Sequence, residues 1–171
     1  MKHKINTRRL VLTPFLIDDF NIFHQLNIDP HIREFMWDGE EIALDTSKEI
    51  MQKNGSHFER DNFGIWKVIL KETDELIGYT GLWYFFDEEQ PQLIYAILKK
   101  FTKQGYAHES SKAIIRYSFE TLDFKYLIAA TDESHLESQK VAKGLGMKYH
   151  EKRMENDKPT LFFRIEKGAL T

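Results

Sequence analysis

Lys99 to Ser118, KKFTKQGYAHESSKAIIRYS, is the stretch that says most about the fold. It follows an apolar run ending at Leu98 that is typical of a strand. One glycine, Gly105, stands in a short polar loop, and a helix is predicted after it whose first turn holds small and polar residues. Backbone N–H groups at such a helix N-terminus lack partners within the helix, and the helix dipole favours an anion beside them. The stretch therefore predicts a strand–loop–helix unit that binds a pyrophosphate-bearing ligand, which makes the chain a candidate enzyme.

The composition is that of an ordinary globular protein. The chain has 171 residues, of which 42% are hydrophobic, so we expect a single domain over residues 1–171 with its own core. Its 24 basic and 27 acidic residues give a net charge of −3, which lacks the strongly basic balance of proteins that bind nucleic acid. Lys99, Lys100 and Lys103 still form a local basic patch beside the loop.

Residue types and segments that the chain lacks exclude several classes of protein. There is no cysteine, which rules out disulfides, thiolate zinc sites and a cysteine nucleophile. The first ten residues, MKHKINTRRL, have no apolar core of signal-peptide length. No stretch approaches the roughly 20 apolar residues of a membrane span. We expect a cytoplasmic protein that holds no metal and has neither a membrane nor a nucleic acid as partner.

The first half of the chain predicts one strand, two or three helices and a hairpin. Apolar spacing of three and four residues marks the helices, and alternation with β-branched residues marks the strands. Asn54-Gly55 is a point at which the longest helix can break. The predicted elements are a strand over Arg8–Phe15, a helix over Ile17–Leu26, a short helix or turn from Asp29-Pro30, a helix from Asp45 or Thr46 to about Glu59, and antiparallel strands over Phe63–Lys71 and Leu76–Phe86.

The second half predicts two helices, each of which follows a strand, and a closing hairpin. The run over Lys125–Thr131 is almost wholly apolar, as expected for a buried strand. The other elements are a strand over Gln92–Leu98, helices over Tyr106 to about Leu122 and Ser134–Leu145, a left-handed cap at Gly146, and strands over Lys148–Met154 and Thr160–Glu166 joined by Asn156–Pro159. The element order is β-α-α-β-β-β-α-β-α-β-β. It predicts an α+β fold in which helices cover both faces of a mixed sheet.

Three segments, in this order and spacing, carry a family resemblance. They are TRRLVLTPF followed by DDF, IYAILKKFTKQGYAHES, and ESHLESQKVAKGLGMKY. Together they resemble the GCN5-related N-acetyltransferase (GNAT) family, and within it the RimJ/RimL-like branch of ribosomal-protein N-terminal acetyltransferases. The resemblance covers nearly the whole chain. It implies a mixed, mainly antiparallel sheet with two splayed parallel central strands and helices on both faces.

The resemblance also implies the co-substrate. In that family acetyl-CoA lies in the wedge between two splayed strands, which here are Gln92–Leu98 and Lys125–Thr131. Backbone groups of the first strand pair with the pantetheine arm, and N–H groups of residues 103–107 hold the pyrophosphate. The cofactor-binding residues implied here are Ala96, Ile97, Leu98, Lys103, Gln104, Gly105, Tyr106, Ala107, His108, His135 and Ser138.

Five positions depart from the family pattern. Thr102 stands where arginine or glutamine is usual, Lys103 where this branch often has glycine, and His135 where an asparagine often begins the last helix. Ala142 occupies the place of a tyrosine that serves some members as acid, and Gln92 lies near that of a glutamate that serves others as base. The resemblance therefore supports cofactor binding more firmly than it supports any particular acid or base.

The implied chemistry is the attack of an amine on a thioester, which needs a base for the amine and a proton or hydrogen bond for the departing thiolate. Ser138 is the predicted acid, although its hydroxyl can instead bond a backbone carbonyl of its helix. Tyr95 is predicted to orient substrate or relay a proton, unless it is simply a core residue. Glu34 is the first candidate for the base. Further candidates are Asp87, Glu88, Glu89 and His31 for the base, and Trp37, Trp83 and Tyr84 for an acceptor pocket.

Alternatives remain open at this point. The acceptor of an N-acetyltransferase could be a protein N-terminus, a polyamine, an amino sugar or an antibiotic. A polyamine would favour an acidic rim, such as residues 38–41 and 87–89 provide. A second reading is a non-catalytic acyl-CoA-binding module with a regulatory role. A Rossmann nucleotide site is disfavoured, since GLGM at 144–147 lacks the full glycine fingerprint and follows a helix. The closing strands can also pair between subunits, which leaves a homodimer open.

Overall fold

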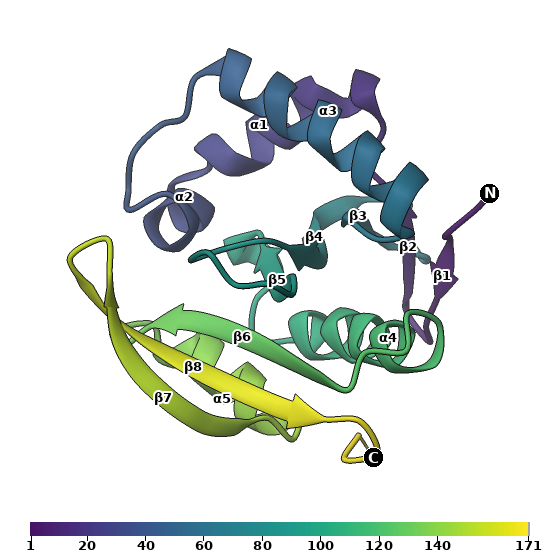
Figure 1. The fold of residues 1–171 in the computed structure, drawn as a ribbon. Helices are drawn as coiled ribbons and strands as arrows, with labels where there is room; N and C mark the ends of the chain where they lie inside the picture. The colour runs from purple at the N-terminus through teal and green to yellow at the C-terminus, as the bar shows by residue number, and fades with distance from the viewer. Residues whose placement is uncertain (171) are drawn as a thin grey trace.

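The computed structural model describes residues 1–170 and divides the strands between two sheets (Figure 1). Within each sheet all neighbouring strands are antiparallel. The five-stranded sheet has the order β1-β2-β3-β4-β5 and the three-stranded sheet the order β6-β8-β7. The strands are β1 (Ile5–Asn6), β2 (Leu10–Pro14), β3 (Ile65–Leu70), β4 (Leu76–Trp83), β5 (Gln92–Ile97), β6 (Tyr126–Asp132), β7 (Lys148–Glu155) and β8 (Lys158–Glu166).

Helices cover both faces of the larger sheet, as the sequence predicted. In Figure 1 the helices α1, α2 and α3 lie on one side of it and α4 on the other, while α5 lies against the smaller sheet. Each side has its own apolar core: Phe23, Met51 and Tyr79 belong to the first, and Ile114 and Phe163 to the second. The helices are η1 (Ile17–Asp19, a 3-10 turn), α1 (Phe20–Ile28), α2 (Pro30–Met36), α3 (Leu44–Asp61), η2 (Lys99–Phe101), α4 (Tyr106–Glu120) and α5 (Leu136–Gly144).

The wedge between β5 and β6 is the feature that positions the site. Gln90, just before β5, donates a hydrogen bond from Nε2 to the carbonyl of Tyr126 at the start of β6, at 2.7 Å. The two strands therefore begin side by side, but no ladder joins them, and each is an edge of its own sheet. The splay that was expected within one mixed sheet thus separates two sheets. Each strand leaves one edge of backbone N–H and C=O groups without strand partners.

The α3 helix is continuous through Asn54-Gly55, where the sequence allowed a break. The Asn54 side chain accepts from the N–H of Ile65 at 2.7 Å and donates to the carbonyl of Phe15 at 3.0 Å. It thereby fastens α3 to the ends of two strands. The neighbouring Gly64 has to lack a side chain, because an added Cβ would lie 2.4 Å from Asn54 Oδ1. A tertiary contact therefore outweighs the weak local helix propensity of this pair.

Several predicted boundaries were wrong. The helix expected over Ile17–Leu26 is a 3-10 turn followed by α1, and β4 ends at Trp83 rather than Phe86. Neither Asp45 nor Thr46 caps α3; its N-cap is Ala43, without a side-chain hydrogen bond. Lys158 and Pro159 belong to β8, so that the closing turn contains only Asn156 and Asp157, with φ of 49° and 61°. Two successive left-handed residues match the twist of the flanking strands.

Two predictions about helix ends were confirmed. Asp29 starts the short helix α2 by accepting from the N–H groups of His31 and Ile32. Gly146 follows α5 with φ of 86°, the left-handed conformation that was expected of it. Within residues 1–170, no helix combines the length and the apolar character needed to cross a membrane.

Candidate functional site

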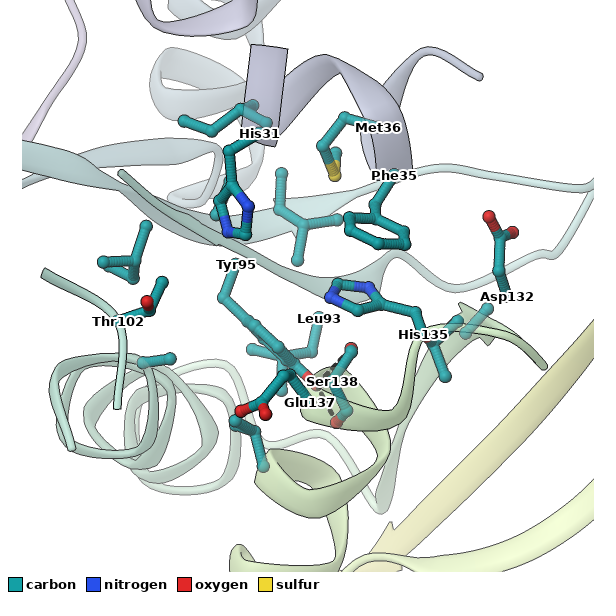
Figure 2. A pocket seen from close by; sticks show the side chains of 18 of the residues that line it. His31, Phe35, Met36, Leu93, Tyr95, Thr102, Asp132, His135, Glu137 and Ser138 are labelled. Atoms are coloured by element: carbon teal, nitrogen blue, oxygen red, sulfur yellow. Dashed lines mark hydrogen bonds between the residues drawn. The ribbon is translucent and has the colours of Figure 1, made fainter. Parts of the chain in front are cut away.

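A cleft of about 970 Å³ opens where β5 and β6 diverge. Its walls are β5 with the loop and first turn of α4, the end of β6 with α5, and α2 with the tip of the β7–β8 hairpin. Figure 2 shows His31 and Phe35 entering from α2, and His135 and Ser138 facing them from α5. The size suits a ligand at the upper end of the range for small-molecule sites.

The first end of the cleft is the turn into α4. Gly105 is the N-cap of that helix with φ of 81°, and Lys103 is also left-handed with φ of 61°. Residues of this turn line the cleft, and the first N–H groups of a helix have no partner within it. Lys99, Lys103 and Lys140 line the same end, so backbone donors, helix dipole and ammonium groups all favour an anion there.

A hydrogen-bonded network holds this turn from behind. Glu109 accepts from the Thr7 hydroxyl at 2.6 Å, from the Arg9 N–H at 2.7 Å and from Arg9 Nε at 2.6 Å. The same guanidinium donates to the Gln104 carbonyl at 2.9 Å and lies over the Tyr106 ring. Burial alone would raise the pKa of Glu109, but these hydrogen bonds outweigh it and hold the pKa below its ordinary value. The network turns the Gln104 carbonyl toward Arg9.

The middle of the cleft contains an unsatisfied polar atom. Thr131, near the end of β6, lines the cleft, and its Oγ1 is buried without a hydrogen-bond partner among the described residues. A buried hydroxyl without a partner is costly and calls for one. Together with the unpaired strand edges, it suits an extended ligand that carries amide groups, such as a pantetheine arm.

The structure brings two predicted catalytic residues, Tyr95 and Ser138, into contact. The Tyr95 hydroxyl donates to the Ser138 carbonyl at 2.9 Å and lies 3.0 Å from Ser138 Oγ. Burial raises the pKa of Tyr95 to about 12, although the hydrogen bond to Ser138 opposes the rise, so the phenol stays protonated at neutral pH. The pair can present a hydroxyl donor to an atom that develops negative charge.

His135, the N-cap of α5, separates the wedge from the outer end of the cleft. Its imidazole stacks on the Phe35 ring of α2, with centroids 3.5 Å apart and planes inclined by 9°. Burial lowers the pKa of His135, and nearby Asp132 opposes this shift while nearby His31 adds to it. The imidazole is therefore neutral at neutral pH.

The outer end of the cleft is aromatic and is bridged by one ion pair. Trp37, Phe85 and Phe86 line it. Lys158 on the hairpin lies 2.6 Å from Asp38, which follows α2, and its Nζ also lies 3.5 Å from Asp132. The hairpin and the loop after α2 are thus linked across the cleft.

Comparison with known proteins decides the family. The acetyltransferase (GNAT) domain matches residues 9–148. The chain belongs to the GNAT acetyltransferase family. This GNAT acetyltransferase is 26% identical to the uncharacterized N-acetyltransferase YnaD of Bacillus subtilis (strain 168) over 144 residues, which is 84% of this chain and 82% of that protein.

Solved structures share the fold of this acetyltransferase. An acetyltransferase of Agrobacterium tumefaciens str. C58 has a TM-score of 0.81 at 21% identity, covering 95% of this chain and 94% of that one. RimL, the ribosomal L7/L12 alpha-N-protein acetyltransferase solved in complex with coenzyme A, has a TM-score of 0.82 at 13% identity, covering 98% and 99%. The expected fold is confirmed, and the chain is an enzyme of the N-acetyltransferase class.

Most predicted cofactor residues of this GNAT acetyltransferase lie on the cleft. Those among the lining residues are Ala96, Ile97, Lys103, Gly105, Tyr106, Ala107, His108, His135 and Ser138. Leu98 and Gln104 are not lining residues. His108 has an Nε2 that lies 3.1 Å from the carbonyl of Gly144, so its ring is engaged by α5.

The predicted acidic bases lie elsewhere. Glu34 is exposed on α2 and does not line the cleft, nor do Asp87 and Glu89. Glu88 is paired with Arg153 at 2.7 Å. None of these carboxylates is placed to meet an amine inside the cleft, whereas His31 is a lining residue.

Of the predicted acceptor aromatics, only Trp37 lines the cleft. Its Nε1 donates to Asn27 at 2.7 Å, which fixes its ring at the end of α2. Trp83 and Tyr84 pack instead around His57.

Among the described residues, no group of three or more His, Asp or Glu side chains is arranged to hold a metal ion. Sequence reasoning missed Arg9, although its place in the TRRL segment was a signal.

Proposed function

We propose that this enzyme transfers the acetyl group of acetyl-CoA to a primary amine. The observation that carries the proposal is the continuity of one cleft, from the anion-binding turn at Gly105 to the Tyr95–Ser138 pair. The turn suits a pyrophosphate, the unpaired edges of β5 and β6 suit the pantetheine arm, and the orphaned Thr131 hydroxyl suits one of its polar groups.

When bound, acetyl-CoA supplies an activated acyl carbon and a leaving thiolate. Ser138 presents its hydroxyl as a hydrogen-bond donor to the departing sulfur, and Tyr95 holds that hydroxyl in place. A hydrogen bond suffices because a thiol has a pKa of about 8.5, so its thiolate is already a tolerable leaving group. Burial of the pair strengthens the interaction by excluding water.

The acceptor is proposed to be an amine on a mainly apolar, uncharged carrier, such as the first residue of a protein N-terminus. The outer end of the cleft is aromatic. Half of the six carboxylates in the acidic rim that would favour a polyamine are neutralised, because Asp38 pairs with Lys158, Glu41 with Arg33 and Glu88 with Arg153. A polycation would have to break these ion pairs to use those three carboxylates.

Calorimetric titration with acetyl-CoA tests the proposal. Wild-type protein is expected to bind with micromolar affinity, and Gly105→Trp is expected to lose binding, since a bulky side chain and a strained φ would close the turn. Gly55→Trp on α3, where an added Cβ meets nothing within 4 Å, is the matched control and should bind normally.

The acceptor is then sought by thiol release with amines of different carriers. Dipeptides and tripeptides with apolar or small first residues should react faster than spermidine. Faster reaction of spermidine would contradict the proposed acceptor but not the transfer. Absence of acetyl-CoA binding would contradict the proposed function itself and favour a role without catalysis.

A further inference from the structure

Two imidazoles project into the cleft from opposite walls. His31 comes from α2 and His135 from the start of α5, and Figure 2 shows both rings directed into the same space. Neither ring has a hydrogen-bond partner among residues 1–170. By contrast, ring nitrogens of His3, His24 and His57 are engaged by neighbouring side chains. An imidazole with a free nitrogen inside a cleft can accept a proton from a ligand.

We propose that His135 is the group that takes the proton from the acceptor amine, a role that rests on the proposed function. His135 lies one helical turn before Ser138, so the two side chains share one side of α5, at the end of the wedge where the acyl group would lie. The acceptor end begins on the other side of its ring, at Phe35. The imidazole therefore stands between the two substrates.

The stack with Phe35 holds the ring in one orientation. Parallel contact at 3.5 Å between centroids leaves the imidazole plane little freedom, while its edge, which carries the nitrogens, stays open to the cleft. A base held in this way stays in the orientation in which it can accept the proton. Phe35 is accordingly a positioning residue for His135.

The charges around His135 keep it available as a base. The groups that face it are His31 and Glu34 from α2, Asp132 from β6 and Glu137 from its own helix. Burial lowers its pKa and outweighs the carboxylates, so the ring is neutral above its ordinary titration range. A neutral imidazole accepts a proton, whereas a charged one would repel an incoming ammonium group.

Other carboxylates near the cleft are less suited to the task. Lys158 lies 2.6 Å from Asp38 and 3.5 Å from Asp132, so an ammonium group already engages both carboxylates. Glu155 is paired with Arg153 at 3.3 Å. Gln92, which lines the wedge, cannot accept a proton under ordinary conditions. Glu137 also lines the cleft, but it lies 3.9 Å from the ammonium group of Lys103. His31 is thus the main competitor.

The protons balance as follows. An acceptor that enters as R–NH₃⁺ gives one proton to the free nitrogen of His135, and its lone pair then forms the C–N bond. The C–S bond breaks with its electron pair leaving on sulfur, beside the Ser138 hydroxyl. The second proton of the nitrogen ends on that sulfur, and the imidazolium returns its proton to water. The products are the acetamide and the free thiol.

Replacement of His135 by asparagine tests the inference, because asparagine keeps hydrogen-bonding groups but cannot act as a base near neutral pH. We expect kcat to fall about 100-fold or more, within the usual contribution of general base catalysis. Acetyl-CoA affinity by calorimetry should stay within about threefold of wild type. His150→Asn, the same change on exposed β7, is the matched control.

The pH profile adds a readout that a structural role would not move. The wild-type rate should fall as the pH decreases below about 6.5, because the imidazole becomes protonated. This fall is separate from ionisation of the acceptor amine, since an α-amino group has a pKa near 8. In His135→Asn this fall in rate at low pH should disappear, while the dependence on ionisation of the amine should remain. In the free protein, NMR titration of the imidazole should give a His135 pKa below the ordinary histidine value of about 6.5.

Three outcomes would overturn the inference. A loss of kcat/KM in His135→Asn that matches a loss of acetyl-CoA affinity would make His135 a cofactor contact. If the fall in rate at low pH disappeared in His31→Asn but remained in His135→Asn, His31 would be the base. A His135 pKa above the ordinary histidine value of about 6.5 would mean that the imidazole is not kept neutral as proposed. If wild type binds acetyl-CoA but acetylates no amine, the proposed function fails. The NMR titration still tests separately whether the pKa of His135 is lowered.

Discussion

The cofactor end of the cleft is held by a partly buried hydrogen-bonded network on a long helix, whereas the acceptor end is held by side-chain contacts between short or exposed segments. At the first end, Glu109 on α4 binds Thr7 and Arg9 from the N-terminal strand region. At the second, the links across the cleft are the Phe35–His135 stack and the Lys158–Asp38 pair. The contrast suggests a rigid binding site for a constant co-substrate and an adaptable one for the amine.

The junction of the two ends should show the largest effect. Ser138→Ala removes the hydroxyl beside the departing sulfur, and we expect kcat to fall about 100-fold, as when one donor to a developing anion is lost. Acetyl-CoA affinity should barely change. Tyr95→Phe is the companion variant, with a smaller loss, since the Ser138 hydroxyl remains but is no longer held. Steady-state kinetics and calorimetry check both, and an unchanged kcat in Ser138→Ala would remove the proposed role.

Replacing Glu109 should weaken the hydrogen-bonded network at the cofactor end of the cleft. Glu109→Gln keeps the shape but removes the charge that accepts from Arg9, which should lower the free energy of unfolding by about 2 kcal/mol. The freed Gln104 carbonyl should also weaken acetyl-CoA binding about tenfold, with little effect on KM for the amine. Urea unfolding and calorimetry measure the two effects. A change in amine KM alone would contradict the separation of the two ends.

The same network predicts how stability changes with pH. Because the folded-state pKa of Glu109 is depressed, its contribution is present above the unfolded-state pKa and is lost as the pH falls through the folded-state value. Wild type should therefore lose stability below about pH 4, the ordinary range for glutamate. The difference between wild type and Glu109→Gln should shrink over the same range. A difference that persists at pH 2 would mean that the charge is not its source.

The adaptable end should respond in the opposite way. Lys158→Met removes the ion pair with Asp38 and the contact with Asp132, both partly exposed, so we expect a stability change below 1 kcal/mol. KM for the amine should change severalfold, with acetyl-CoA affinity unaltered. Lys152→Met, on the neighbouring strand and paired with Glu133, is the matched control. An equal effect of both variants would show that the bridge over the cleft has no role.

The local parts of this protein follow from neighbouring residues. The Asp29-Pro30 start of α2, the left-handed Gly146 and the turn at Gly105 were predictable, because capping groups and φ preferences act within a few residues. Hydrophobic periodicity predicted most of the element order, although it missed β1. The GNAT fold was implied by the family resemblance of three segments. Ser138 was found through the family resemblance and Tyr95 through its phenol on the predicted strand, and the structure joins them at hydrogen-bond distance.

Tertiary structure decided the rest. That Asn54-Gly55 stays helical, that Arg9 holds the cofactor turn, and that Phe35 stacks on His135 depend on residues far apart in sequence that only packing brings together. The same holds for the acidic residues: sequence shows that Glu34 and Glu88 carry charge, but not that one faces solvent and the other Arg153. Charge and conformational preference belong to a residue, whereas burial and partners belong to the fold.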